Sequence, residues 1–382
     1  MDVTTGEFLG FLSLSWQAAV MLVIGGVLVW LGIAKKVEPV LLVPIGAGAI
    51  MANIPLGGVA EEGGFLAVLR DAGIHTELFP LLIFIGVGAM IDFEPFLQRP
   101  YTILLGAAAQ FGIFGTFFLA YLLGDGLLHL LDFSLQDAAS IGIIGSADGP
   151  TSIFVSTILQ SKYTAAIVVA AYSYMAMVPI IQPPIIRAMC SKEERALNML
   201  DAEERRVSQR TKIVFPIVTI LVVGLIAPKA TPLIGALMFG NLLRESGVVE
   251  GLSSTAQNEL ANIVTILLGI TVGGMMTGTG FLRPETILVF ALGIVAFSLD
   301  TVAGVLLGKL MYIFSGRKIN PMIGACGISA FPMSSRVVHK LGLEANPYNH
   351  LLMYAAGSNT AGQIASVVAG GVMLILIPMF AG

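Results

Sequence analysis

The chain has 382 residues, of which 56% are hydrophobic and 12% charged, and its formal net charge is −4. This composition excludes an ordinary soluble globular protein and is typical of a polytopic membrane protein. The sequence shows no basic stripe for nucleic-acid binding, and its two cysteines, Cys190 and Cys326, form no metal or redox spacing.

Apolar segments follow one another along the whole chain. They lie at roughly 17–34, 38–54, 78–92, 101–124, 136–160 and 164–186, and again at 213–227, 231–243, 259–274, 285–308, 319–342 and 348–380. We therefore predict an all-α polytopic membrane protein with about ten to twelve transmembrane segments.

A polar connection separates the two sets of segments and carries an excess of cations: Arg187, Lys192, Arg195, Arg205, Arg206, Arg210 and Lys212. A cation-rich loop of this kind favours the cytoplasmic side, and its Glu/Arg spacing suits a short solvated helix. We expect an N-terminal interfacial segment at 1–16, a first membrane repeat at 17–186, a cytoplasmic linker at 187–212 and a second membrane repeat at 213–382.

The second set of segments repeats the first. The stretch from Phe96 to Leu104 recurs as Phe281 to Leu288, including its Arg-Pro pair, and Pro39 and Pro232 each open an apolar run. Each copy then continues into an apolar helix and a glycine-rich broken segment. Matched order over several segments indicates duplication, and we predict two inverted repeats, each with a broken helix.

The first broken segment runs from Ile141 to Gln160. Gly149 and Pro150 disfavour a helix, so we predict that 145–151 is non-helical. Asp148 lies in this break, and a carboxylate at membrane depth must face a cavity, a partner or a cation. With freed carbonyls and the hydroxyls of Ser146, Thr151 and Ser152, it would suit Na⁺. The alternative is a helix-capping aspartate at the membrane edge.

The second broken segment runs from Lys318 to Arg336, with Gly327 and Pro332 marking its unwound centre. Two broken segments in corresponding halves indicate a transport site near the midplane. Arg336 follows the break, where a guanidinium can fork onto a carboxylate. An interfacial arginine that snorkels out of the bilayer is the alternative.

Further polar residues lie in the last segment of each half: Tyr172, Ser173 and Tyr174, and then Ser358, Asn359, Thr360 and Gln363. They could complete a cation site or make helix–helix hydrogen bonds. Asp300 is another intramembrane acid, without a counterpart in the first half. From these residues alone, a plain secondary transporter, either a Na⁺/carboxylate symporter or a Na⁺/H⁺ antiporter, explains the repeat, the breaks and Asp148.

Four motifs carry a resemblance to a known family. These are Gly145–Thr151, Ala171–Ala176 with Ile181–Pro184, Lys318–Pro321 and Gly342–Pro347. They resemble the β subunit of the sodium-pumping, biotin-dependent decarboxylases, and the likeness extends over nearly the whole chain. Members act in complexes that decarboxylate oxaloacetate, glutaconyl-CoA, methylmalonyl-CoA or malonate.

The resemblance implies a subunit that releases CO₂ from carboxybiotin, consumes a proton and exports Na⁺ across the cell membrane. A carboxyltransferase α subunit, a separate biotin-carrier protein and a small membrane-anchor subunit are its implied partners, and the β subunit is expected to form a homo-oligomer. The family's functional positions fall on Asp148, Tyr174, Asn320, Gly324, Ser329, Arg336 and Asn359.

The resemblance also assigns roles to these positions. Arg336 and Gly324 would bind carboxybiotin, and Tyr174 or Ser329 would relay the proton. Na⁺ ligands would be Asp148, Asn320, Asn359 and Ser146. Residues 55–78 are compact where the oxaloacetate type has an insertion, and Met238 stands where that type has a cysteine. Both departures favour the glutaconyl-CoA or methylmalonyl-CoA type.

Overall fold

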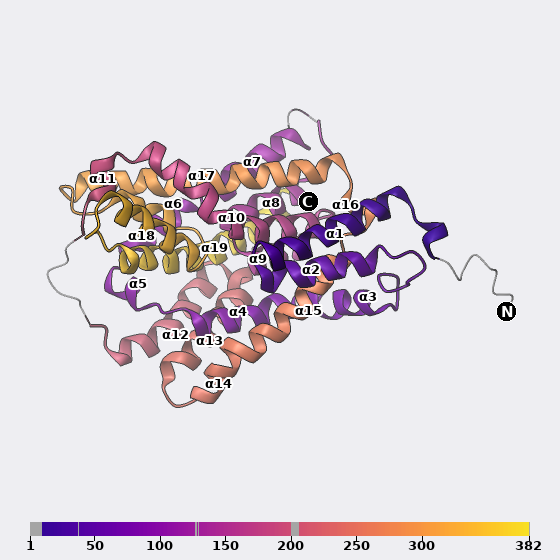
Figure 1. Cartoon of the computed structure of the whole chain (residues 1–382). Helices are drawn as coiled ribbons and strands as arrows, with labels where there is room; N and C mark the ends of the chain where they lie inside the picture. The colour runs from indigo at the N-terminus through magenta and orange to yellow at the C-terminus, as the bar shows by residue number, and fades with distance from the viewer. Residues whose placement is uncertain (1–9, 37, 127, 129, 200–205, 382) are drawn as a thin grey trace.

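The computed structural model describes residues 10–36, 38–126, 128, 130–199 and 206–381. Every regular element among these residues is a helix, as the composition predicts (Figure 1). Most of the expected interfacial segment 1–16 lies outside the described residues, as does Arg205 of the linker.

The first half of the chain forms η1 (Gly10–Ser13), α1 (Trp16–Ala34), α2 (Pro39–Ala52), α3 (Phe65–Leu69), η2 (Arg70–Ile74), α4 (Leu78–Met90), α5 (Glu94–Gln98), α6 (Thr102–Ala109), α7 (Phe111–Leu123), α8 (Leu135–Gly142), η3 (Ile143–Ser146), α9 (Gly149–Ile158) and α10 (Thr164–Met189), where η denotes a 3-10 or π-helical turn. The remainder forms α11 (Lys192–Ala196), α12 (Gln209–Ile226), η4 (Pro228–Ala230), α13 (Thr231–Ser246), α14 (Glu250–Thr255), η5 (Ala256–Leu260), α15 (Ala261–Gly274), α16 (Gly278–Phe281), α17 (Pro284–Phe314), η6 (Pro321–Cys326), α18 (Met333–Ala345) and α19 (Leu352–Ala381).

Six stretches of the described chain are long and apolar enough to cross a membrane: α1, α6 with α7, α10, α12, α17 and α19. A seventh is possible if α3–η2 and α4, bent by 62°, count as one span. The predicted ten to twelve spans are therefore not confirmed. Segments such as 38–54 and 259–274 form helices of 14 residues, which reach only about 21 Å against about 30 Å of hydrocarbon.

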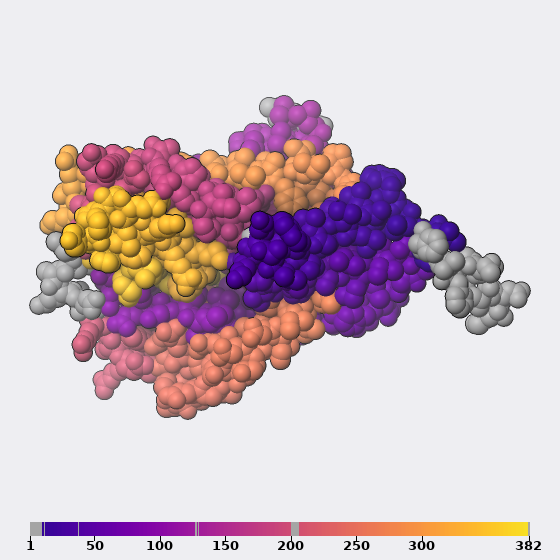
Figure 2. Space-filling model, viewed as in Figure 1, coloured from indigo at the N-terminus to yellow at the C-terminus, as the bar shows by residue number. Residues whose placement is uncertain are grey.

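Helices from the two halves of the chain pack closely on one another. α2 lies between α1 and α15, and α4 packs against α13 (Figure 1). Glycines permit both approaches, because a Cβ at Gly48 would overlap the Ile270 carbonyl and a Cβ at Gly240 would overlap the Ile85 carbonyl. Figure 2 shows the first helices, in indigo and violet, at one end of the molecule and the α18 region, in yellow, toward the other.

The linker contains the short helix that its charge spacing predicts, α11, which begins with a capping box between Ser191 and Glu194. Its backbone is bound to the second half of the chain by side chains. The Asn349 amide donates to the Arg195 carbonyl at 2.8 Å, and the Tyr354 hydroxyl donates to the Met199 carbonyl at 2.5 Å. The described stretch 195–199 of the linker therefore lies against the ends of η6, α18 and α19.

Candidate functional site

The first broken segment is interrupted at only two residues. Ala147 takes a left-handed conformation, with φ 52°, and Asp148 is extended between η3 and α9. The predicted non-helical stretch was too long, because Gly149, Pro150 and Thr151 form the first turn of α9. A proline fits there, since the first-turn N–H groups have no partner within the helix.

Asp148 caps α9. One carboxylate oxygen accepts from the Thr151 N–H at 3.2 Å and the other from the Thr151 hydroxyl at 2.8 Å. The capping alternative weighed from the sequence is therefore present in the structure. The cap is buried, however, with only 6% of the residue exposed, and carboxylate oxygens have lone pairs beyond those used here. Capping leaves Asp148 free to hold a cation as well.

The second broken segment is unwound where the sequence predicts. η6 ends at Cys326, residues 327–332 form no regular element, and α18 begins at Met333. The two breaks meet, because the Ser329 N–H donates to the Ser146 carbonyl at 3.0 Å. The Ser329 hydroxyl donates to the Ser366 hydroxyl at 2.5 Å, and Ser366 also interacts with the Asp148 carboxylate. A short polar chain thus joins the second break to Asp148.

One face of α19 holds the second break in place. The Asn359 amide donates to the Ile328 carbonyl at 2.6 Å, and the Gln363 amide donates to the Ser329 carbonyl. Ser366, which the sequence analysis did not identify, continues this face. Helical spacing could have identified Ser366 from the sequence, because residues three and four apart, such as Asn359, Gln363 and Ser366, share a face of a helix.

A cavity of about 430 Å³ lies beside the breaks. Its polar lining consists of Glu38, Asp148, Tyr172, Thr265, Ser329 and Gln363, and its apolar wall comes mainly from α2 and α4. The Tyr172 hydroxyl is buried and has no hydrogen-bond partner among the described residues. Glu38, which the sequence analysis did not identify, brings a second carboxylate to the cavity. Tyr172, which it named among the polar residues that could complete a cation site, brings a hydroxyl.

Four of the predicted site residues lie elsewhere. The Tyr174 hydroxyl donates to the Phe290 carbonyl of α17, and Gly324 packs so tightly on Gly304 that a Cβ on either would overlap the other's carbonyl. Asn320 donates to the Leu197 carbonyl of the linker at 2.8 Å, and Arg336 is exposed on α18. Their assignments to catalysis, carboxybiotin and Na⁺ stay predictions.

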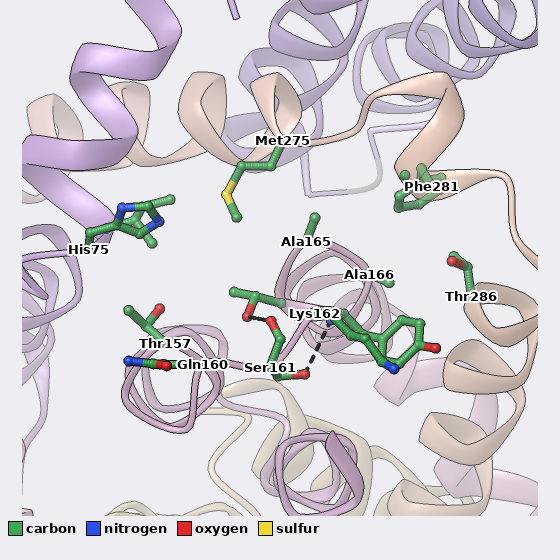
Figure 3. A pocket seen from close by; sticks show the side chains of 14 residues that line it. His75, Thr157, Gln160, Ser161, Lys162, Ala165, Ala166, Met275, Phe281 and Thr286 are labelled. Carbon is green, nitrogen blue, oxygen red and sulfur yellow. Dashed lines mark hydrogen bonds between the residues drawn. The ribbon is translucent and has the colours of Figure 1, made fainter. Parts of the chain in front are cut away.

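A larger pocket, of about 520 Å³, lies at the far end of α9. Figure 3 shows His75, Thr157, Gln160 and Met275 around it, with Ser161 and Lys162 at its base. The Lys162 amine is paired with Asp132 and lies 3.9 Å from an Asp137 oxygen. This pocket lies apart from both breaks and from Asp148, so the smaller cavity is the candidate site.

Two discontinuous segments that meet close to a buried carboxylate, among apolar helices long enough to cross a membrane, are typical of ion-translocating membrane proteins. A family model described as "Na+-transporting oxaloacetate decarboxylase beta subunit" matches residues 17–377. The chain belongs to this family of Na⁺-transporting decarboxylase β subunits, which confirms the resemblance carried by the motifs.

Individual relatives extend over almost the whole chain. It is 47% identical to oxaloacetate decarboxylase beta chain 2 of Salmonella typhi, with 96% of each chain covered. It is 49% identical to methylmalonyl-CoA decarboxylase subunit beta of Propionigenium modestum, again with 96% of each covered. It is 48% identical to the Veillonella parvula protein of the same name, over 96% of this chain and 95% of the relative.

Proposed function

We propose that this chain is the membrane subunit that releases CO₂ from carboxybiotin and couples that release to Na⁺ export. One observation carries the proposal: Asp148 lies buried where the two breaks are joined by the bond from Ser329 to Ser146. A cation bound at Asp148 would therefore be sensitive to any movement of the second break.

The methylmalonyl-CoA type is the form that we propose. Alignments to the Salmonella typhi and Veillonella parvula relatives cover the same 96% of this chain, but they extend over 421 and 368 residues respectively. The oxaloacetate relative thus has insertions that this chain lacks. The expected glutaconyl-CoA type has no support among the relatives named above.

The proposed Na⁺ ligands are Asp148, as the carboxylate, with oxygens of Ser146 and Asn359 from the two sides of the contact. Hard oxygen ligands of this kind suit Na⁺. The Asn359 side-chain oxygen accepts from the Ser335 hydroxyl at 3.2 Å, which fixes its orientation near the second break. Asn320 stays a prediction, since its side chain is bound to the linker.

Carboxybiotin would supply the driving reaction, because loss of CO₂ leaves a ureido nitrogen that takes up a proton. In this chain, Ser329 is the hydroxyl that lies at the break, and Tyr172 is the free hydroxyl that lines the same cavity. Arg336, exposed on α18, would receive the carboxylate from the solvent side as a forked, planar donor. Tyr174 stays a prediction as the proton relay.

Coupling requires that carboxybiotin and Na⁺ favour different access states. An inverted repeat would supply two bundles that can rock against one another. The paired packing of α2 on α15 and of α4 on α13 supports that proposal, because it matches the second apolar segment of each half with the third apolar segment of the other.

The proposed assembly contains a carboxyltransferase α subunit, a biotin-carrier protein and a small membrane-anchor subunit, with several copies of this β subunit in the cell membrane. We place the linker, 187–212, in the cytoplasm. The competing function is a secondary Na⁺-coupled transporter without biotin chemistry, which the buried carboxylate alone would also serve.

Purification of the native complex decides between these two functions. We expect a biotinylated carrier to copurify, and Na⁺ to accelerate CO₂ release from added carboxybiotin in proteoliposomes. Na⁺ uptake that is indifferent to carboxybiotin, in a preparation that contains no biotinylated partner, would establish the secondary transporter instead.

A further inference from the structure

Asp300 is a buried carboxyl group at which two other elements converge. It lies in α17 and is 1% exposed. A Cβ at Gly112, in the first turn of α7, would overlap one of its oxygens, and a Cβ at Gly145 of η3 would overlap the other. Gly145 lies in η3, two residues before the first break, so this carboxyl group packs against the turn that leads into the break.

Among the described residues, no side chain donates a hydrogen bond to this carboxyl group, and neither oxygen has a partner within the usual hydrogen-bond distance and angle. The N–H groups of Gly112 and Ile113 face it, but the Ile113 N–H donates to the Gln110 carbonyl at 3.1 Å. The titratable groups on the elements packed around α17 are Tyr121 of α7, Asp137 of α8, Tyr172, Tyr174 and Arg187 of α10, and Cys326 of η6, with Asp148 beyond η3. The one cation among these described groups, Arg187, is paired with Glu344 and makes no ion pair with Asp300.

Asp137 shows how this chain surrounds another buried carboxyl group with hydrogen-bond donors. It is 2% exposed, yet it accepts from the Ser134 hydroxyl at 2.8 Å, the Ser161 hydroxyl at 2.7 Å and the Lys162 N–H at 3.2 Å. The Lys162 amine is also near. Burial of a charge is costly unless it is paired and hydrogen-bonded in this way. Asp300 has no such surroundings.

We propose that Asp300 is a proton-binding site, that it carries a proton in this arrangement, and that its protonation is coupled to the first break. The backbones of Gly112 and Gly145 occupy the space in which the further ligands of a metal ion would stand, so a proton fits and Na⁺ does not. This inference deepens the proposed function, on which it rests for its role in pumping. It assigns proton binding alone, with no bond made to biotin.

Infrared difference spectroscopy of the purified complex tests the protonation. At neutral pH we expect a carbonyl band of a protonated carboxylic acid that shifts in D₂O, disappears in Asp300→Asn and persists in Asp132→Asn, an exposed acid. We also expect its intensity to change when Na⁺ is added. A spectrum unchanged by Asp300→Asn would overturn the proposal, and a band indifferent to Na⁺ would overturn the coupling to the break.

Thermal unfolding gives a second measurement that requires no pumping. Asparagine is close in shape to the neutral acid, so Asp300→Asn should unfold at a temperature at least as high as the wild type. Asp137→Asn should unfold several degrees lower. An Asp300→Asn protein that is as destabilised as Asp137→Asn, or that fails to fold, would show that the charge is required. Because neither readout depends on turnover, a failure here is distinct from a failure of the proposed function.

Discussion

The backbone N–H of Ser329 donates a hydrogen bond of 3.0 Å to the backbone carbonyl of Ser146. These residues belong to the two broken segments, one from each half of the chain. Because backbone groups make the bond, it depends on the path of both breaks and persists whatever side chains are present. A movement of either break therefore changes the surroundings of Asp148, two residues beyond Ser146.

Substitution of Asp148 separates its cap from its charge. Asparagine is as good an N-cap as aspartate, so Asp148→Asn should fold and assemble. It removes the charge, and we expect the Na⁺ concentration for half-maximal activation to rise tenfold or more, equivalent to about 1.4 kcal/mol. The measurement is Na⁺-dependent decarboxylation in proteoliposomes. Thr151→Val, which removes one cap donor and keeps the carboxylate, is the matched control; normal Na⁺ activation of Asp148→Asn would refute a ligand role.

Tyr172 and Tyr174 should respond differently to phenylalanine. The buried Tyr172 hydroxyl has no hydrogen-bond partner in the described part of the chain, and such a group costs about 1–3 kcal/mol. Tyr172→Phe should therefore be at least as stable as the wild type but slower in turnover. Tyr174→Phe loses its hydrogen bond to Phe290 and should be less stable by about 1 kcal/mol. Thermal unfolding and decarboxylation rates of both variants test this. Full activity of Tyr172→Phe beside an inactive, stable Tyr174→Phe would instead establish Tyr174 as the proton relay.

Local chemistry explains what the sequence could predict of the site. The ends of the second break follow from Gly327 and Pro332, and the position of Asp148 in the first break follows from Gly149 and Pro150. Which side chains contact the breaks depends on how the helices pack, and local sequence does not determine that packing. Tyr172 and Tyr174 lie two positions apart, which turns their side chains by about 200° around a helix, and the sequence does not specify which of them faces the breaks.

The membrane crossings were harder to predict for a related reason. Hydropathy finds apolar runs, but it does not tell a spanning helix from a short one buried by its neighbours. α2 and α15 are apolar enough to suggest crossings, yet they cover one another through Gly48. The hydrogen-bond partner of Asn320 was equally difficult to predict, because it is a carbonyl of the linker, 123 residues away in the sequence.

Asn320 offers a test between its predicted and observed surroundings. Its amide donates to the Leu197 carbonyl at 2.8 Å and the Arg195 carbonyl at 3.3 Å. We expect Asn320→Ala to speed tryptic cleavage of the linker several-fold and to leave the Na⁺ requirement unchanged. Asn346→Ala, which loses only one bond to the linker, that of 3.2 Å to the Ala196 carbonyl, should have a smaller effect on cleavage. A raised Na⁺ requirement with unchanged cleavage would restore the ligand assignment.

Two glycines of α13 provide a matched test of the packing between the halves. A Cβ at Gly240 would overlap the Ile85 carbonyl of α4, whereas a Cβ at Gly235 would meet nothing within 4 Å. Gly240→Ala should be destabilised by about 1–3 kcal/mol. Gly235→Ala should gain up to about 1 kcal/mol from helix propensity. Unfolding in detergent measures both; equal stabilities would show that α4 and α13 do not pack this closely.

Arg336 tests whether an exposed guanidinium receives the carboxylate of carboxybiotin. The buried face of α18 includes Ser334, Val337, Val338 and Leu341, while Arg336 and Lys340 are exposed one turn apart. A guanidinium makes two parallel hydrogen bonds to a carboxylate, and an ammonium offers no such fork. We therefore expect both Arg336→Lys and Arg336→Ala to slow carboxybiotin decarboxylation by tenfold or more, about 1.4 kcal/mol, while the α subunit still transfers its carboxyl group.

Lys340→Ala is the control for that experiment, because it removes a cation from the same exposed face without touching the proposed site. Its decarboxylation rate should match the wild type. If Arg336 only anchors α18 at an interface, lysine should replace it with little loss, since both long side chains can snorkel. A normal rate for Arg336→Lys, or equal losses in Arg336→Ala and Lys340→Ala, would assign the effect to surface charge and exclude a specific carboxylate site.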